Sequence, residues 1–247
     1  MILPVMVVGV MVGIVGSTDR FPAADGPHML SQAARLSNAL LAGEWGWVWE
    51  QWFHFTAPHP PVGYVPAILA GLFFDSTRWI VAFADAICLL LLLDAVQRIC
   101  RKDAWWTGQL AWATGCACSL TWWSSDHYGY DLAAAATVLQ AVSWLHRAHT
   151  GPRPRDWLFF GFWLAMAFLT KYGAPLICFL PVVWVCGRSV WFRAHHVGLA
   201  VLGFVLVAVP YYIENLDTVV PYVRSALNPP DLPGNYPDQR TLLQRFG

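Results

Sequence analysis

Long uncharged stretches recur along the chain, and short polar turns separate them. A helix needs about 20 consecutive apolar residues to cross the hydrocarbon core of a bilayer, so each long stretch is a candidate span. The candidate spans are 1–17, 79–98, 104–123, 131–147, 157–170, 174–187 and 197–213. The pattern predicts an all-α polytopic membrane protein, in which residues 1–213 form a bundle of about seven transmembrane helices.

Three other segments do not fit a simple span. Residues 61–74 are apolar but short and contain prolines and glycines, which predicts a re-entrant or juxtamembrane helix. Residues 33–43 bring Leu36, Leu40 and Leu41 near one helical face, as in an amphipathic helix on the membrane surface. Residues 214–247 are rich in proline and predict an irregular outer loop, after which we expect further chain.

The composition agrees with a membrane protein. The chain is 57% hydrophobic and only 12% charged, and it contains 15 tryptophans, a residue that gathers at bilayer interfaces. Because the formal net charge is +0, no nucleic-acid partner is expected. The 6 cysteines lie within or at the ends of apolar runs, which favours small core residues over a disulfide framework or a metal site.

The basic residues predict the orientation. Three turns, 98–103, 146–156 and 188–196, hold more than half of the 15 lysines and arginines. These residues are Arg98, Arg101, Lys102, Arg147, Arg153, Arg155, Arg188 and Arg193. Since cytoplasmic turns carry the excess of positive charge, these turns and the N-terminus are expected inside. The long first loop, 18–78, then lies outside together with Lys171 and the tail.

Asp25 is the first candidate for chemistry in this outer loop. A carboxylate there could take the proton from an attacking hydroxyl group. The same residue also suits the start of a helix near residue 28, with Pro27 in the first turn. Asp19 is a competing acid in the same loop, and a metal site made of His54, His59 and Asp25 is a weaker alternative.

Several short motifs occur in an order that resembles one family of enzymes. They are Asp25-Gly26-Pro27-His28, L-L-A-G-E-W, His59-Pro60-Pro61-Val62-Gly63-Tyr64, Tyr130-Asp131-Leu132 and L-T-K-Y-G-A-P-L around Lys171. Their order and shared outer location resemble the membrane glycosyltransferases of the GT-C superfamily. The nearest branch contains the dolichyl-phosphate-mannose protein mannosyltransferases and the bacterial aminoarabinose and Rgt-like transferases. The resemblance covers most of residues 1–215.

The resemblance implies roles for several residues. Asp25 would act on the acceptor, although the Asp-Glu pair of the family is Asp25-Gly26 here. His28, His59 and Lys171 would bind a lipid phosphate, and Asp131 would face the active site as a second catalytic acid. Other interpretations stay open: interfacial packing for the histidines, a favourable helix N-terminal charge for Asp131, and an ammonium that reaches the interface for Lys171.

The outer tail supplies one more candidate by the same resemblance. Family members carry a phosphate-binding arginine in this region, and Arg224 is the first choice. Arg240 and Arg245 are the alternatives.

Together these features imply an inverting glycosyltransferase. It would move a sugar from a polyprenyl-phosphate donor to an acceptor hydroxyl of a glycan, lipid or protein, with no cofactor and no metal ion. We expect it in a bacterial inner membrane, with the active site on the periplasmic side. The second hypothesis is a transporter or an inactive subunit of the same fold, since Asp85 lies within a span and Lys171 interrupts another apolar region.

Overall fold

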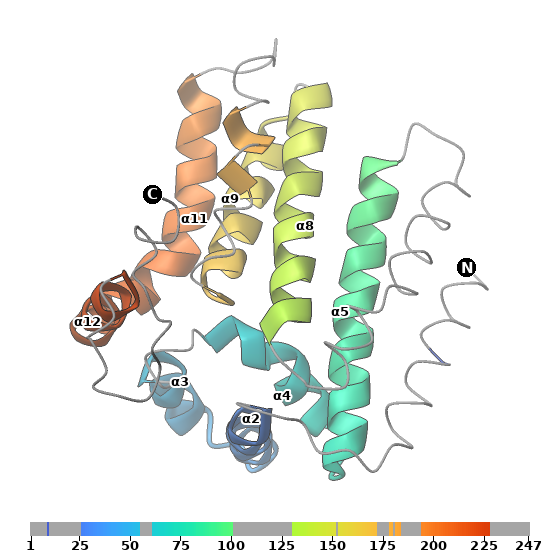
Figure 1. The fold of residues 1–247 in the computed structure, drawn as a ribbon, viewed down its shortest axis with the longest axis vertical. Coiled ribbons are helices and arrows are strands. Elements are labelled where there is room, and N and C mark those ends of the chain that lie inside the picture. Colours follow the sequence, from blue (N-terminus) through green and yellow to red (C-terminus); the bar gives the residue numbers. More distant parts are fainter. Residues whose placement is uncertain are drawn as a thin grey trace, which may run out of the picture.

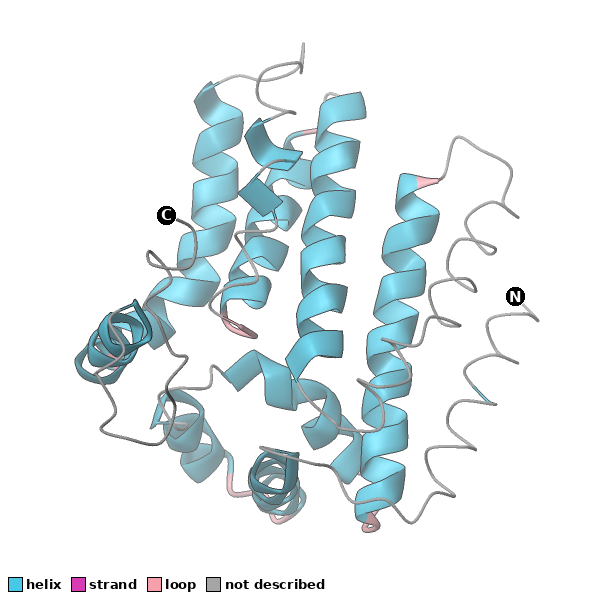
Figure 2. Ribbon diagram, in the orientation of Figure 1, coloured by secondary structure: helices cyan, strands magenta, loops and turns pink. Residues whose placement is uncertain are grey.

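The computed structural model shows an all-helical chain. It describes residues 9, 26–54, 61–100, 130–151, 153–171, 178–179, 181–183 and 194–227. Within these residues the chain forms helices joined by short turns, and none of them belongs to a strand (Figure 2). The predicted α class is therefore confirmed for the part of the chain that the structure describes.

Four long helices form the body of the molecule, and each packs against the next along the chain (Figure 1). Their bounds are Thr77–Ile99 for α5, Tyr130–Thr150 for α8, Pro154–Phe168 for α9 and Ala194–Glu214 for α11. They coincide within a few residues with the predicted spans 79–98, 131–147, 157–170 and 197–213. The apolar runs located these helices well because Pro154 and the flanking charged turns limit each run.

The expected bundle of about seven spans is not confirmed. Among the described residues, only Thr77–Ile99 and the 20 residues His195–Glu214 are both long and apolar enough to cross a membrane. Helix α8 has 21 residues but includes Asp131, Gln140 and Arg147, and α9 has only 15 residues. The predicted spans 1–17, 104–123 and 174–187 lie mostly outside the described residues.

Five other elements gather at one end of these four helices, the lower end in Figure 1. They are α2 (Gly26–Leu41), α3 (Trp45–His54), the 3-10 helix η1 (Pro61–Tyr64), α4 (Val65–Gly71) and α12 (Leu216–Leu227). Gly43, with φ of 78°, turns the chain between α2 and α3, and the Glu44 N–H closes the turn on the Ala39 carbonyl at 2.9 Å. These elements form a cap over that end of the bundle.

The segment predicted as a short, non-spanning helix is η1 followed by α4. Four 3-10 and seven α-helical residues rise about 18 Å, which is too short for the hydrocarbon core. Most of the segment is buried, with Tyr64 and Ala67 at 0% exposure, and it packs against α2 and α5. The segment is therefore covered by protein on several sides.

Helix α2 is amphipathic as predicted, and of the three leucines expected on one face only Leu41 is exposed. Leu30, Ala33 and Leu36 are buried against α4 and the start of α5, and Leu40 packs at the edge of that cluster. Leu41, predicted on the same face, is 64% exposed. The buried apolar residues of α2 are Leu30, Ala33, Leu36 and Ala39, and Leu41 lies past the end of this packed stretch because it is the last residue of the helix.

The prediction that the tail is irregular from residue 214 is wrong for its first part. Residues Leu216–Leu227 form α12, with Pro221 inside the helix. Leu216, Val219, Val220, Val223 and Leu227 recur at helical spacing, and the dense run of prolines begins only at residue 229. The prolines after residue 228 led to the prediction of a loop for the whole tail, although residues 216–227 have a helical period.

Helices α9 and α11 approach each other closely at two glycines. A Cβ atom on Gly161 would overlap the carbonyl group of Ala200, and one on Gly203 would overlap the Leu158 carbonyl oxygen. Small residues that let two backbones meet are common in helix contacts within membranes. These two positions therefore fix how α11 lies along α9.

Polar side chains join α5 to α8 near the opposite, upper end of the bundle. The Arg98 Nη1 donates to Gln140 Oε1 at 2.7 Å and to Ser143 Oγ at 2.9 Å, and Arg98 also pairs with Asp94. The Arg98 guanidinium lies 4.3 Å from the centroid of the Trp144 ring. Gln140 and Ser143 are buried, so this network satisfies polar groups that would otherwise be costly in the helix contact.

Candidate active site

Three motifs that the sequence analysis selected meet at the lower end of the bundle. The Val62 N–H in η1 donates to the Leu169 carbonyl at the end of α9, at 2.9 Å. Helix η1 also contacts α8, whose first turn contains Asp131. The structure therefore brings together Pro61–Tyr64, the start of α8 and the residues that lead to Lys171, although they are far apart in the sequence.

Asp131 and Lys171 form an ion pair at this place. The Lys171 Nζ lies 2.5 Å from the Asp131 Oδ1, and the two residues are 40 positions apart. The side chains are 55% and 51% exposed, respectively, so solvent reaches both groups. The pair is accessible to a ligand that approaches the capped end of the bundle.

Each partner lies at a helix end that favours its charge. Asp131 is in the first turn of α8, where the helix dipole stabilises a carboxylate. Lys171 lies three residues after the last residue of α9, near the helix end where the dipole favours a cation. Its backbone N–H donates to the Ala167 carbonyl at 3.0 Å, and the preceding Thr170 is 1% exposed. The Lys171 backbone is thus held firmly while its side chain extends into solvent.

Apolar and polar contacts hold the cap against the long helices. Val62, Leu169 and Tyr211 form a buried cluster, and Trp52 and Tyr212 pack against it. This cluster joins α3, η1, α9 and α11. It supports the backbone on both sides of the ion pair without contributing a charge of its own.

Asn215 is a residue of this region that the sequence analysis did not select. It is buried, and its Nδ2 donates to the Phe53 carbonyl at the end of α3 at 2.5 Å and to the Tyr211 carbonyl at 2.9 Å. Tyr212 adds a bond from its hydroxyl group to the Phe168 carbonyl at 3.2 Å. The sequence feature that could have identified Asn215 is its position between two segments of helical period, α11 and α12.

The other predicted site residues are placed only in part. Asp25 and His59 lie outside the described residues. His28 lies in the first turn of α2, and the structure describes its backbone but not its side chain. Arg224 is exposed near the end of α12, and no described ion pair or hydrogen bond joins it to Lys171 or Asp131. The structure thus brings together Asp131 and Lys171 from the predicted set.

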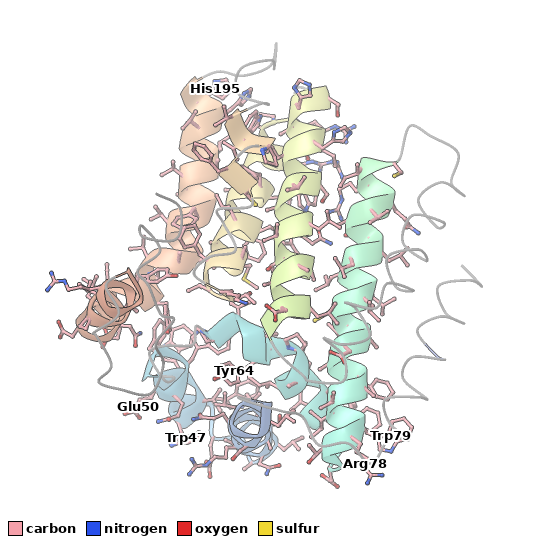
Figure 3. The ribbon with its side chains drawn as sticks, viewed as in Figure 1. Trp47, Glu50, Tyr64, Arg78, Trp79 and His195 are labelled. Atoms are coloured by element: carbon pink, nitrogen blue, oxygen red, sulfur yellow. The ribbon has the colours of Figure 1, made fainter. Side chains whose placement is uncertain are left out.

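Aromatic and charged side chains surround the same end of the molecule. Figure 3 shows Trp47 and Glu50 on α3, Tyr64 within the cap, and Arg78 with Trp79 at the start of α5. On α3, Trp45 and Trp49 are both 68% exposed. Exposed tryptophans of this kind are typical of the level where lipid head groups begin.

The described residues contain no group of three or more histidine, cysteine, aspartate or glutamate side chains that could hold a metal ion. The pair itself offers an ammonium group and a carboxylate. An ammonium binds a phosphate as a point charge, and a carboxylate accepts hydrogen bonds from hydroxyl groups.

Two of the described helices are long and apolar enough to cross a bilayer, which is what an integral membrane protein requires. Residues 58–213 match the model of the dolichyl-phosphate-mannose-protein mannosyltransferase family, and the chain belongs to this family. The predicted family is therefore confirmed, and its members are membrane glycosyltransferases of the GT-C type. Comparisons with curated proteins and with solved structures gave no match.

The matched region has a clear relation to the site. It begins after α3 and ends within α11, so it includes His59, η1, Asp131 and Lys171. Asp25, His28 and Arg224 lie outside it.

Proposed function

We propose that the protein transfers a sugar from a polyprenyl-phosphate donor to the hydroxyl group of a glycan, lipid or protein acceptor, with inversion at the anomeric carbon. The observation that carries this proposal is the ion pair Asp131–Lys171, which lies where η1, α8 and α9 meet. It provides one group suited to a phosphate and one suited to sugar hydroxyls. Both groups lie in the region that matches the family.

Lys171 has the role of phosphate-binding cation in this reaction. A lipid phosphate is already a good leaving group, so the site needs positive charge and hydrogen-bond donors more than a general acid. An exposed ammonium at a fixed backbone position meets that need. We assign His28, His59 and Arg224 to the same phosphate from the sequence resemblance.

Two carboxylates would bind the acceptor and the sugar. Asp25 would orient and deprotonate the acceptor hydroxyl, which then attacks the anomeric carbon while the bond to the phosphate oxygen breaks. Asp131 would accept hydrogen bonds from the sugar. Gly26 stands where the family has a second acid, so Asp25 would act without that neighbour.

The reaction would take place on the outer side of the membrane. Residues 146–156, one of the predicted cytoplasmic turns, lie where α8 ends and α9 begins, at the upper end in Figure 1. The cap, Asp131 and Lys171 lie at the other end. With the basic turns in the cytoplasm, the site faces the periplasm of a bacterial inner membrane.

The test combines donor binding with transfer in purified protein reconstituted in nanodiscs. Lys171→Ala and His59→Ala should each weaken binding of polyprenyl phosphate by about tenfold, because each removes a contact with the phosphate. Asp25→Asn should leave binding unchanged and abolish transfer.

Arg35→Ala is the matched control for a lost cation. Arg35 is exposed on α2 at the same end of the molecule and has no role in the proposed site. Binding that does not respond to Lys171→Ala, or that falls equally with Arg35→Ala, would reject the site. Transfer that survives in Asp25→Asn would reject the assigned base.

A further inference from the structure

We infer that the Lys171 ammonium exchanges partners during the reaction cycle. It pairs with Asp131 when the site is empty and with the lipid phosphate when the donor is bound. It pairs with Asp131 again as the product dissociates. This inference rests on the proposed function and adds to it how the phosphate site is controlled. Asp131 is then a competitor for Lys171 as well as a ligand for the sugar.

The first support is that the ion pair is easy to open. Both side chains are about half exposed, and exposed pairs contribute only about 0–1 kcal/mol. Each charge also has its own helix terminus, so neither group is left without stabilisation when the pair separates. A buried pair such as Arg147–Asp156, where the Asp156 side chain is 2% exposed, would lose far more.

The second support is that only the side chain of Lys171 needs to move. Its backbone N–H is bonded to the Ala167 carbonyl, and the neighbouring Leu169 carbonyl accepts the Val62 N–H. Leu169 and Thr170 are buried, which prevents the backbone from following the side chain. The four-carbon stem of lysine lets the ammonium swing between two acceptors around a fixed Cα atom.

The third support comes from the charges of the ligands. The sugar donor is a phosphodiester with one negative charge, whereas the polyprenyl phosphate product is a monoester with about 1.5 to 2 negative charges at pH 7. The product therefore binds a lysine more strongly than the donor does. The Asp131 carboxylate competes with the product for the Lys171 ammonium. This competition weakens product binding and helps the product dissociate.

An alternative is that Lys171 stays on Asp131 and binds phosphate with its remaining N–H groups, since an ammonium has three donors. Asp131 would then weaken binding only by repelling the phosphate. If the partners exchange, Asp131 weakens phosphate binding only when Lys171 is present. If Asp131 only repels the phosphate, it weakens binding whether or not Lys171 is present.

The experiment is a double-mutant cycle on equilibrium binding of polyprenyl phosphate to the full chain in nanodiscs. Asp131→Asn should tighten binding by about two- to fivefold, the range that corresponds to an exposed ion pair. Lys171→Ala should weaken binding, and adding Asp131→Asn to Lys171→Ala should change nothing further. Because the readout is binding, the role of Asp131 toward the sugar does not affect it.

Asp217→Asn is the matched control for a lost negative charge. Asp217 is also an exposed acid in the first turn of a helix at the same end, and this change should leave binding unaltered. Equal tightening by Asp131→Asn with and without Lys171 would overturn the exchange. So would a loss of affinity in Asp131→Asn, which would mean that Asp131 holds Lys171 in place for the phosphate.

The outcomes separate this inference from the proposed function. If wild type binds polyprenyl phosphate and only Lys171→Ala alters the affinity, the exchange is wrong and the phosphate site stands. If wild type does not bind polyprenyl phosphate, or Lys171→Ala has no effect, the phosphate site and the exchange fail together.

Discussion

Lys171 and Arg98 are both cations at helix ends, but their surroundings differ. Arg98 has a side chain that is 13% exposed and that bonds to Gln140, Ser143 and Asp94, so its position is fixed. Lys171 is 55% exposed and pairs with an equally accessible Asp131. At the scale of single residues, the molecule thus places a cation with several partners in a helix contact and a solvent-exposed cation with one described partner at the candidate site.

Asn215 offers a test of how the cap is attached. Asn215→Ala removes the amide that bonds to the Phe53 carbonyl, and a lost buried hydrogen bond costs about 1–3 kcal/mol. Amide hydrogen exchange in α3 should therefore accelerate by about 5- to 150-fold while exchange in α5 stays unchanged. Asn38→Ala, at an exposed position on α2, is the control. Unchanged exchange in α3 would show that Trp52 and its apolar neighbours hold this helix without Asn215.

At the scale of elements, the contact between α9 and α11 depends on the absence of side chains. Gly161 and Gly203 allow the two backbones to meet, while Phe168 and Phe204 form an edge contact nearer the cap, with ring centroids 5.2 Å apart. This contact positions the end of α9 and therefore Lys171. A change at the glycines acts on the site from a distance because it alters the angle between the two helices.

Gly203→Ala should destabilise the protein by about 1–3 kcal/mol, since the new methyl group meets backbone atoms of α9 that cannot move aside. The measurement is thermal unfolding in detergent, with the bound-phosphate affinity as a second readout. Gly198→Ala is the matched control, because it lies in the same helix and its Cβ would meet nothing within 4 Å. Equal melting temperatures for the two variants would contradict the close approach of α9 and α11.

At the scale of the whole molecule, the two ends of the bundle have different chemistry. His195, at the upper end in Figure 3, and the turn between α8 and α9 lie at the basic end. The cap, with its exposed tryptophans and the ion pair, lies at the other. The positive charges predict that the first end is cytoplasmic and that the cap is outside.

Cysteine labelling in intact cells tests this orientation. In a cysteine-free background, Asp217→Cys should react with a membrane-impermeant maleimide, whereas Thr150→Cys should react only after permeabilisation. Both positions are exposed at opposite ends of the structure. The same labelling pattern for the two variants would contradict a bundle that crosses the membrane between them, and the reverse pattern would invert the proposed topology.

The sequence was informative wherever local pattern determined the structure. Apolar runs bounded by charges located α5, α8, α9 and α11, and the short run with prolines indicated η1 and α4. The ion pair joins residues 40 positions apart and depends on how two helices pack, which no local pattern describes. The resemblance selected Asp131 and Lys171 separately but did not predict their contact. Asn215 was missed for the same reason, and α12 was missed because the later prolines outweighed a helical period.

The attachment of the cap has a consequence for synthesis. The four long helices pack against one another in the order in which they occur in the chain, but Phe53 in the cap bonds to Asn215, which is 162 residues later. At roughly 5–20 residues per second, the ribosome needs about 8 to 30 s to add that interval. In the proposed topology, the first loop therefore crosses the membrane long before Asn215 is synthesised, and the candidate site is completed only when α11 has been inserted. A chain interrupted before that point would carry the candidate loop in the membrane without a finished site.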